Sequence, residues 1–138
     1  MHPHPVECSI RVRYAETDQM GVAYYGNYFT WFEVGRVEWC KAHGFNYRDM
    51  EREEGAFFVV VGASCRYRAP ARFDDLLTIR TTLKHARGSV VSFEYEVYNQ
   101  ESGQLLATGE TTHVVTGADM KRRDLPDRYL QLFGLERS

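Results

Sequence analysis

Hydrophobic and polar residues alternate at the start of the chain. Between residues 6 and 14, Val6, Cys8, Ile10, Val12 and Tyr14 share one parity, and charged or polar residues occupy the positions between them. A period of two residues is typical of a strand with one buried face. The pattern therefore predicts a half-buried strand over residues 6–14.

A long apolar segment follows, from Asn27 to about residue 42 or 43. Aromatic and aliphatic residues cover most of its helical circumference, interrupted only by a narrow polar stripe of Thr30, Glu33 and Lys41. A helix that is apolar on nearly all sides is normally buried, so we expect a sheet to wrap around it. Asn27 is a suitable N-cap residue, and Gly44 is a suitable C-terminal stop.

The second half of the chain has the pattern of successive strands. Runs rich in β-branched and aromatic residues predict strands at residues 57–68, 76–84, 89–98 and 105–116, and their spacing favours antiparallel hairpins. Pro70 breaks the pattern after the first of these runs, because proline cannot donate to a sheet ladder. Pro126 begins a short helix that reaches about Phe133.

This order of elements indicates an α+β fold in a single domain spanning residues 1–138. We expect residues 1–5 to form a loose N-terminus. Gly35 lies in the middle of the long helix, where glycine costs about 1 kcal/mol relative to alanine. Its presence predicts that another backbone comes close to the helix at this point.

Composition narrows the class of protein. The net charge is −2 and the longest basic cluster is Lys121-Arg122-Arg123, so nucleic acid is not an expected partner. No apolar run reaches the roughly 18 residues of a membrane span, and residues 1–5 lack the apolar stretch of a signal peptide. Reduced thiols and a cytoplasmic location are expected, because the cysteines are odd in number and widely spaced, at Cys8, Cys40 and Cys65.

The junction between the first strand and the long helix carries the candidate chemistry. Asp18 lies in a glycine-containing loop, and the helix start that follows supplies backbone N–H groups that no helical carbonyl uses. A carboxylate can act as base or nucleophile, and N–H donors can stabilise an oxyanion, so the pair suits acyl transfer. The structural alternative is that Asp18 only caps the helix or closes an Asx turn.

Two segments resemble a known family. Within residues 14–33, the signature of Asp18, Gly21, Tyr25, Asn27 and Tyr28 is similar to that of the hotdog-fold acyl-CoA thioesterases, in the 4-hydroxybenzoyl-CoA thioesterase and YbgC-like group. Residues 67–79 resemble the second signature of the same family. Together with the order of elements, the resemblance covers roughly residues 6–133. Many YbgC-like members have His at the position of Tyr25, whereas the benzoyl-CoA branch has Tyr, so the acyl group stays open.

The resemblance implies a hotdog fold, in which a curved antiparallel sheet of five to six strands wraps one long central helix, with a short C-terminal helix. It also implies a homodimer or homotetramer with active sites between subunits. The expected reaction is hydrolysis of an acyl-CoA to the free acid and CoA, without a metal or redox cofactor. By analogy, Asp18 is the catalytic carboxylate, the Tyr25 backbone N–H polarises the thioester carbonyl, and the substrate contacts Tyr24, Gly26 and Tyr28.

Two further carboxylates lie near these residues. Glu16 is close enough in sequence to raise the pKa of one carboxyl group of the pair, but we expect it to be a solvated loop residue. Glu33 is expected to pair with Arg36 three residues later. The alternative places Glu33 in the active site of a neighbouring subunit.

The phosphates of CoA require cations near the site. The candidates are Lys84 and Arg87, which precede a predicted turn, and residues Lys121 to Arg123 after the last strand, with Arg123 preferred. The further options are Arg66, Arg68 and Arg72.

Other chemistries fit the sequence less well. No His-x-x-x-His or Cys-x-x-Cys spacing predicts a metal site, the cysteines fall within apolar patterns, and no Gly-x-Ser-x-Gly elbow occurs. A hotdog hydratase or dehydratase is one alternative function, although it typically needs a His near the helix and none occurs between Asp18 and Lys41. A non-catalytic acyl-CoA-binding module is the other.

Overall fold

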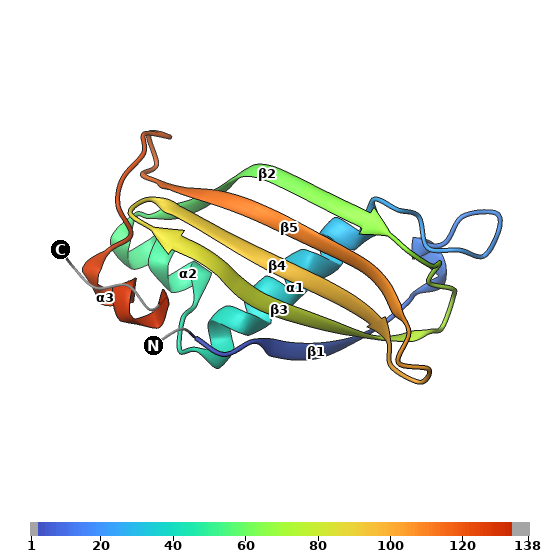
Figure 1. Cartoon of the computed structure of the whole chain (residues 1–138). Helices are drawn as coiled ribbons and strands as arrows, with labels where there is room; N and C mark the ends of the chain where they lie inside the picture. The colour runs from blue at the N-terminus through green and yellow to red at the C-terminus, as the bar shows by residue number, and fades with distance from the viewer. Residues whose placement is uncertain (1–2, 134–138) are drawn as a thin grey trace.

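The computed structural model describes residues 3–133 and has the α+β architecture that the sequence predicts. Its elements are, in chain order, β1 (Val6–Arg11), a 3-10 turn (Tyr14–Glu16), α1 (Asn27–Ala42), α2 (Tyr47–Asp49), a π-helical turn (Met50–Glu54), β2 (Phe57–Tyr67), β3 (Leu76–Arg87), β4 (Val90–Asn99), β5 (Leu105–Thr116), α3 (Asp127–Leu130) and a 3-10 turn (Gln131–Phe133). Figure 1 shows α1 lying across one face of the sheet, with the loop between β1 and α1 at one end and α2 and α3 at the other.

The five strands form one antiparallel sheet in the order β1-β3-β4-β5-β2. The predicted hairpins β3–β4 and β4–β5 are confirmed. The expectation of a hairpin between β2 and β3 is wrong, because residues 68–75 carry the chain across the end of the sheet and β2 pairs with β5, from Phe57 opposite Thr116 to Tyr67 opposite Ala107. Strands β1 and β2 are therefore the two edges of the sheet.

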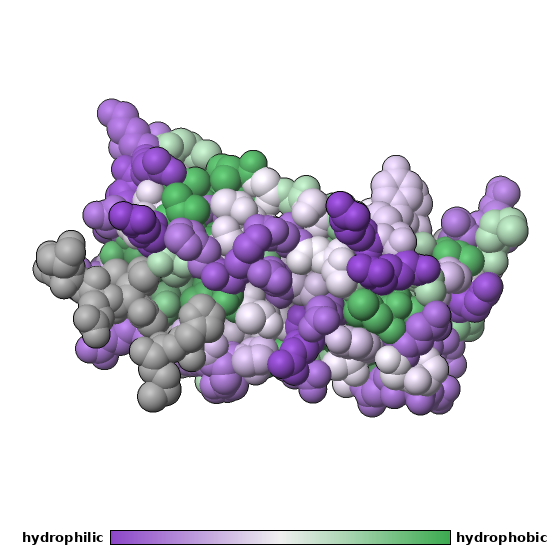
Figure 2. Space-filling view, in the orientation of Figure 1, coloured by the Kyte–Doolittle hydropathy of each residue, from purple (hydrophilic) through white to green (hydrophobic). Residues whose placement is uncertain are grey.

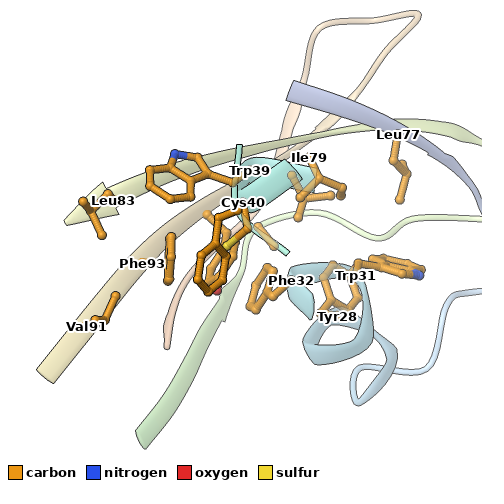
Figure 3. Close-up of a cluster of buried hydrophobic side chains, with 14 of the residues drawn as sticks. Tyr28, Trp31, Phe32, Trp39, Cys40, Leu77, Ile79, Leu83, Val91 and Phe93 are labelled. Atoms are coloured by element: carbon orange, nitrogen blue, oxygen red, sulfur yellow. The ribbon is translucent and has the colours of Figure 1, made fainter. Parts of the chain in front are cut away.

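One face of α1 and the inner face of the sheet form the core. Trp31, Phe32 and Trp39 are almost fully buried against the strands (Figure 3). The Phe32 ring stacks on Tyr95 with centroids 4.4 Å apart, and Trp39 meets Phe93 edge-on at 5.2 Å. Aromatic pairs in these geometries add to the stabilisation from buried area, and they hold the helix against β4.

The opposite face of α1 differs from the expectation of burial on nearly all sides. Within a single chain the sheet covers one side only, so Phe29 and Val34 are 37% and 38% exposed, beside the exposed Thr30 and Glu33. Asn27 is not the N-cap: Gly26 holds that position without a side-chain cap, and the Asn27 amide instead donates to the Glu16 carbonyl, 2.7 Å away.

The N-terminal region differs from the prediction in where its first strand ends. Residues 1–2 lie outside the described part, but the His4 ring packs on His43 with centroids 4.3 Å apart. The first strand ends at Arg11 instead of residue 14, because the chain turns into the 3-10 turn. Tyr14 is consequently 77% exposed and does not join the buried face.

Gly35 allows the close approach that its position predicts, but to side chains of β3 and not to another backbone. A Cβ at Gly35 would lie 2.4 Å from Thr81 Oγ1 and 2.9 Å from Ile79 Cγ2. On the facing side, a Cβ at Gly109 would lie 2.3 Å from the Phe32 ring. The two glycines therefore set how closely α1 sits on the sheet.

A chain of polar side chains is buried beneath the middle of α1. Arg36 Nη1 donates to the Tyr95 hydroxyl at 3.1 Å, this hydroxyl lies 2.5 Å from Thr111 Oγ1, and Thr111 Oγ1 lies 2.8 Å from His113 Nε2. His113 is 1% exposed. Burial, and secondarily the charge of Arg36, lowers the pKa of His113 to about 3.

We expect His113 to make the protein acid-labile. The folded state keeps His113 neutral down to about pH 3, whereas the unfolded chain binds a proton near pH 6.5, so its contribution to stability is lost as the pH falls below 6.5. At pH 5 this amounts to about 2 kcal/mol. Urea unfolding at pH 7.5 and pH 5 should therefore show a larger loss of unfolding free energy for the wild type than for His113→Gln. Equal losses would contradict a neutral buried His113.

Candidate active site

Asp18 lies in a tight turn that its own side chain closes. Its Oδ1 accepts hydrogen bonds from the backbone N–H of Met20 at 2.8 Å and of Val22 at 3.3 Å, and Gly21 completes the turn with a φ of +74°. The Asx-turn alternative is thus present in the structure. The second carboxylate oxygen makes no hydrogen bond within residues 3–133, and Asp18 is exposed. The turn therefore orients the carboxylate and leaves one oxygen available for chemistry.

Glu16, expected to be solvated, is 6% exposed and ties the loop to α1. Its Oε1 accepts from Arg13 N at 2.8 Å and its Oε2 from Trp31 Nε1 at 2.9 Å, while its carbonyl accepts from Tyr24 N at 2.8 Å. Burial by itself raises the pKa of Glu16, but the hydrogen bonds from Arg13 and Trp31 outweigh it and lower the pKa below its usual value. Sequence patterns do not predict this contact, because Trp31 lies fifteen positions away from Glu16.

We expect Glu16→Gln to destabilise the protein by about 1–3 kcal/mol, because an amide nitrogen would face an N–H donor and leave it unpaired in a buried place. The loss should be accompanied by lower activity, since Asp18 and the start of α1 are positioned through Glu16. Thermal unfolding and steady-state kinetics measure both effects. Glu101→Gln, in the exposed β4–β5 turn, is the matched control and should change neither. An unchanged melting temperature in Glu16→Gln would contradict this role.

The start of α1 presents free backbone donors next to this loop. Within the described residues, the N–H groups of Tyr25 and Gly26 have no hydrogen-bond acceptor, whereas the N–H groups of Asn27 and Tyr28 donate to the carbonyls of Tyr24 and Tyr25. The Tyr24 ring lies over Gly26, where a Cβ would come within 2.8 Å of Tyr24 Cε2. A side chain at this position would therefore displace the Tyr24 ring.

These groups line one cavity of about 410 Å³, between the start of α1 and the end of β2. It is lined by Asp18, Val22, Ala23, Tyr24, Tyr25, Tyr28, Tyr67, Arg68, Ala69 and Pro70. The structure thus brings together Asp18, Tyr24, Tyr25 and Tyr28, all predicted from the sequence. Gly26 borders Tyr25 but does not line the cavity.

The β2 side of the cavity contains two residues to which sequence reasoning gave little or no role. The Tyr67 hydroxyl donates to the Tyr25 carbonyl at 3.0 Å, and its ring meets Tyr28 edge-on with centroids 4.9 Å apart. Burial raises the pKa of Tyr67, so its hydroxyl stays protonated as a donor. Arg68, only a minor option for CoA, is the one cationic residue among residues 3–133 that lines the same cavity as Asp18.

The three preferred phosphate-binding candidates lie elsewhere in the same chain. Lys84 is on the outer face of the sheet, and its ammonium group donates to both carboxylate oxygens of Glu110 at 3.0 and 3.1 Å. Arg87 ends β3, a strand of 12 residues or roughly 40 Å, at the end away from the Asp18 loop. Arg123 is at that same end and donates to the Glu54 carbonyl at 3.1 Å. A single chain therefore does not bring them to Asp18.

The cysteines and histidines do not form a second reactive centre here. Burial raises the pKa values of the three thiols, that of Cys40 to about 12, so they are poor nucleophiles. Within residues 3–133, no group of three or more His, Cys, Asp or Glu side chains is arranged to hold a metal ion. No helix in that part of the chain has the length and apolarity needed to cross a membrane.

Comparison with known proteins gives consistent matches. Residues 20–106 match the family model described as the thioesterase superfamily. The chain is 36% identical over 111 residues to the Bacillus subtilis protein YneP, covering 80% of this chain and 79% of that one. It is 35% identical over 117 residues to the acyl-CoA thioester hydrolase YbgC of Escherichia coli, covering 85% and 87%. A hypothetical protein from Thermus thermophilus has a crystal structure with a TM-score of 0.87 and 34% identity, over 93% of this chain and 96% of that one.

Proposed function

The chain belongs to the thioesterase superfamily and is a thioester hydrolase, and we propose that it cleaves acyl-CoA thioesters in the cavity between Asp18 and the start of α1. The observation that carries the proposal is the pairing of an oriented carboxylate with an unused backbone donor in one cavity. Asp18 has a free carboxylate oxygen, and it lines the cavity together with Tyr25, whose N–H has no acceptor within residues 3–133.

In the proposed mechanism, the thioester carbonyl oxygen accepts a hydrogen bond from the Tyr25 N–H. This donor stabilises the oxyanion when the carbonyl carbon becomes tetrahedral. Tyr24 and Tyr28 contact the acyl-thioester portion, and Gly26 leaves space for the Tyr24 ring. The CoA sulfur then leaves as the thiolate and takes up a proton.

Asp18 can drive this step by two routes. As a general base, it takes a proton from the water that attacks the carbonyl carbon. As a nucleophile, it attacks that carbon itself and forms a mixed anhydride, which water opens to the acid and the free carboxylate. Label in the Asp18 side chain after a single turnover in ¹⁸O-labelled water identifies the nucleophile route, because only opening of the anhydride at the Asp18 carbonyl carbon can place it there.

A thiol-release assay over aromatic, short and long acyl-CoAs tests the function. We expect release of CoA and the free acid with water as the only co-substrate, and no requirement for added metal after treatment with a chelator. Hydration of an enoyl-CoA without thiol release would favour the hydratase alternative. Tight acyl-CoA binding with no product would favour the binding module.

We further propose that the enzyme self-associates into a dimer or tetramer through β2 and the exposed face of α1. Strand β2 pairs with β5 on one side only, and Val60 and Val61 on it are 51% and 60% exposed. Figure 2 shows hydrophobic side chains along the margin of the molecule where β2 runs. Phe29 and Val34 add apolar surface on α1. An exposed apolar edge strand readily pairs with another copy, and the phosphate-binding cations are proposed to reach the site from that copy.

Val61→Lys should convert the assembly into monomers and abolish most of the activity, because a charge on the pairing edge opposes association and the site needs both copies. Light scattering after gel filtration gives the mass of each species. Ser9→Lys, which adds the same charge to the opposite edge on β1, should leave the mass unchanged. A monomeric wild type, or an unaltered mass in Val61→Lys, would refute the assembly through β2.

A cytoplasmic location is also proposed. Cys8, Cys40 and Cys65 are all unpaired, which suits a reducing compartment. Fractionation of cells that produce the tagged protein tests this.

A further inference from the structure

A second cavity opens at the other end of the space between α1 and β2. It has a volume of about 270 Å³ and is lined by Glu33, Arg36, Val37, Tyr47, Glu51, Phe58 and His113. We call it the Arg36 cavity. It shares no lining residue with the Asp18 cavity, and Arg36 lies nine residues into α1, or about 14 Å from its start.

The buried polar chain can carry its hydrogens in one direction. Arg36 can only donate, so the Tyr95 oxygen accepts from it, and we assign the Tyr95 O–H as the donor to Thr111. With that assignment the Thr111 O–H donates to an unprotonated His113 Nε2. The proton of neutral His113 is then on Nδ1, a buried atom without a hydrogen-bond partner in the described chain.

Two other groups of the cavity also lack a partner among the described residues that would satisfy them: Arg36 has no carboxylate partner, and the Tyr47 hydroxyl has no well-formed hydrogen bond. None of the ion pairs among the described residues includes Arg36, so the expected pair with Glu33 is wrong: the guanidinium turns inward to Tyr95. Within residues 3–133 the Tyr47 hydroxyl is buried without a hydrogen bond of ordinary geometry, and it interacts electrostatically with Arg36 and Cys40. Buried polar groups in native proteins are nearly always paired, and a positive charge is costly to bury alone.

From this arrangement we propose that the Arg36 cavity binds a carboxylate on a small apolar body. A guanidinium can hold a carboxylate through two parallel N–H bonds, and Tyr47 and His113 supply further donors. Val37 and Phe58 provide the apolar wall. The volume lies below the roughly 300–1,000 Å³ of sites for drug-sized ligands, which limits the ligand to a short aliphatic chain or a single ring.

Glu33 and Glu51 contribute the only carboxylates of the lining, and both residues are exposed. Solvent screens their repulsion of a bound anion but does not remove it. A carboxylate should consequently bind more tightly when Glu51 is neutralised. A purely apolar cavity would bind its ligand equally well with and without the Glu51 charge.

The first experiment uses benzoate and hexanoate as free probes, with benzamide and hexanamide as uncharged controls of the same shape. Titration is followed by calorimetry and by the ¹⁵N signals of the His113 ring. We expect saturable binding of the acids, at least tenfold weaker binding of the amides, and a protonated Nδ1 with an unprotonated Nε2 in the free protein. Equal affinity for acids and amides would mean that the cavity does not recognise the charge, and no saturation would mean that it holds only water. Either result overturns the proposal.

Three conservative variants keep the test independent of folding. Arg36→Lys keeps the charge but loses the planar fork, and should weaken benzoate binding about tenfold, the equivalent of one charge-assisted hydrogen bond. Tyr47→Phe removes a hydroxyl that makes no hydrogen bond of ordinary geometry within the described chain, so it should fold normally and bind more weakly. Glu51→Gln should bind more tightly. Unchanged affinity in all three would overturn the site.

The carboxylate can belong to a free acid or to the far end of an acyl-CoA, and the second source rests on the proposed thioesterase function. Hydrolysis of dodecanedioyl-CoA relative to dodecanoyl-CoA distinguishes them, because an extended acyl chain of this length spans the about 14 Å between the start of α1 and Arg36. If the ratio of kcat/KM values falls in Arg36→Lys, the acyl group supplies the carboxylate; if the ratio is unchanged while benzoate binding weakens, a free acid does. Failure to hydrolyse any acyl-CoA would refute the function and leave the binding result standing.

Discussion

Replacement of Asp18 by Asn is expected to lower kcat by about 10²–10⁴-fold, the usual contribution of a general base, and by more if Asp18 is the nucleophile. An amide oxygen can still accept from the N–H groups of Met20 and Val22, which hold the present turn at 2.8 and 3.3 Å. It can neither take a proton from water nor attack a thioester. Steady-state thiol release should therefore fall while acyl-CoA binding and the circular dichroism spectrum are retained.

The chain contains a matched control for this substitution. Asp119 Oδ1 accepts from Lys121 N at 3.0 Å, two residues later, as Asp18 does from Met20. Asp119→Asn therefore makes the same chemical change in a second exposed Asx turn outside the site and should leave kcat unaltered. Wild-type turnover in Asp18→Asn would remove Asp18 from the mechanism, and an equal loss in both variants would show that turn geometry is responsible.

The second large effect is expected at Gly35. Alanine in a helix interior is normally favoured over glycine by about 1 kcal/mol, so propensity alone predicts that Gly35→Ala stabilises the protein. The new Cβ would lie 2.4 Å from Thr81 Oγ1 and 2.9 Å from Ile79 Cγ2, and overpacking of a filled core typically costs about 1–3 kcal/mol. We expect the clash to dominate, with a lower unfolding free energy in urea.

Thr30→Ala on the exposed side of the same helix is the control. It makes a favourable change in propensity without a steric conflict, so it should stabilise the protein slightly. Opposite signs in the two variants would show that packing against β3 decides the effect at Gly35. Stabilisation by both would mean that α1 can shift away from the sheet at little cost.

Much of the Asp18 cavity could be predicted because its parts are neighbours along the chain. Asp18, Tyr24, Tyr25 and Tyr28 lie within eleven residues of one another, and a loop followed by a helix start places such residues together with little help from the remaining fold. Glu16 shows the limit of this reasoning. Its burial depends on a hydrogen bond from Trp31. Trp31 lies on one side of α1, and only the packing of α1 on the sheet decides which way that side faces.

The sequence patterns determined the class of the fold, since alternation and apolar runs report which faces are buried. They also identified Asp18 as the candidate carboxylate, because a turn and the free N–H groups of a helix start are local features. Tertiary structure alone decided three features: the order of the strands, the presence of Tyr67 and Arg68 in the Asp18 cavity, and the hydrogen bond from Arg36 to Tyr95. The physical reason is that each of these depends on contacts between residues far apart in the chain, and such contacts form only when α1 and the sheet are packed together.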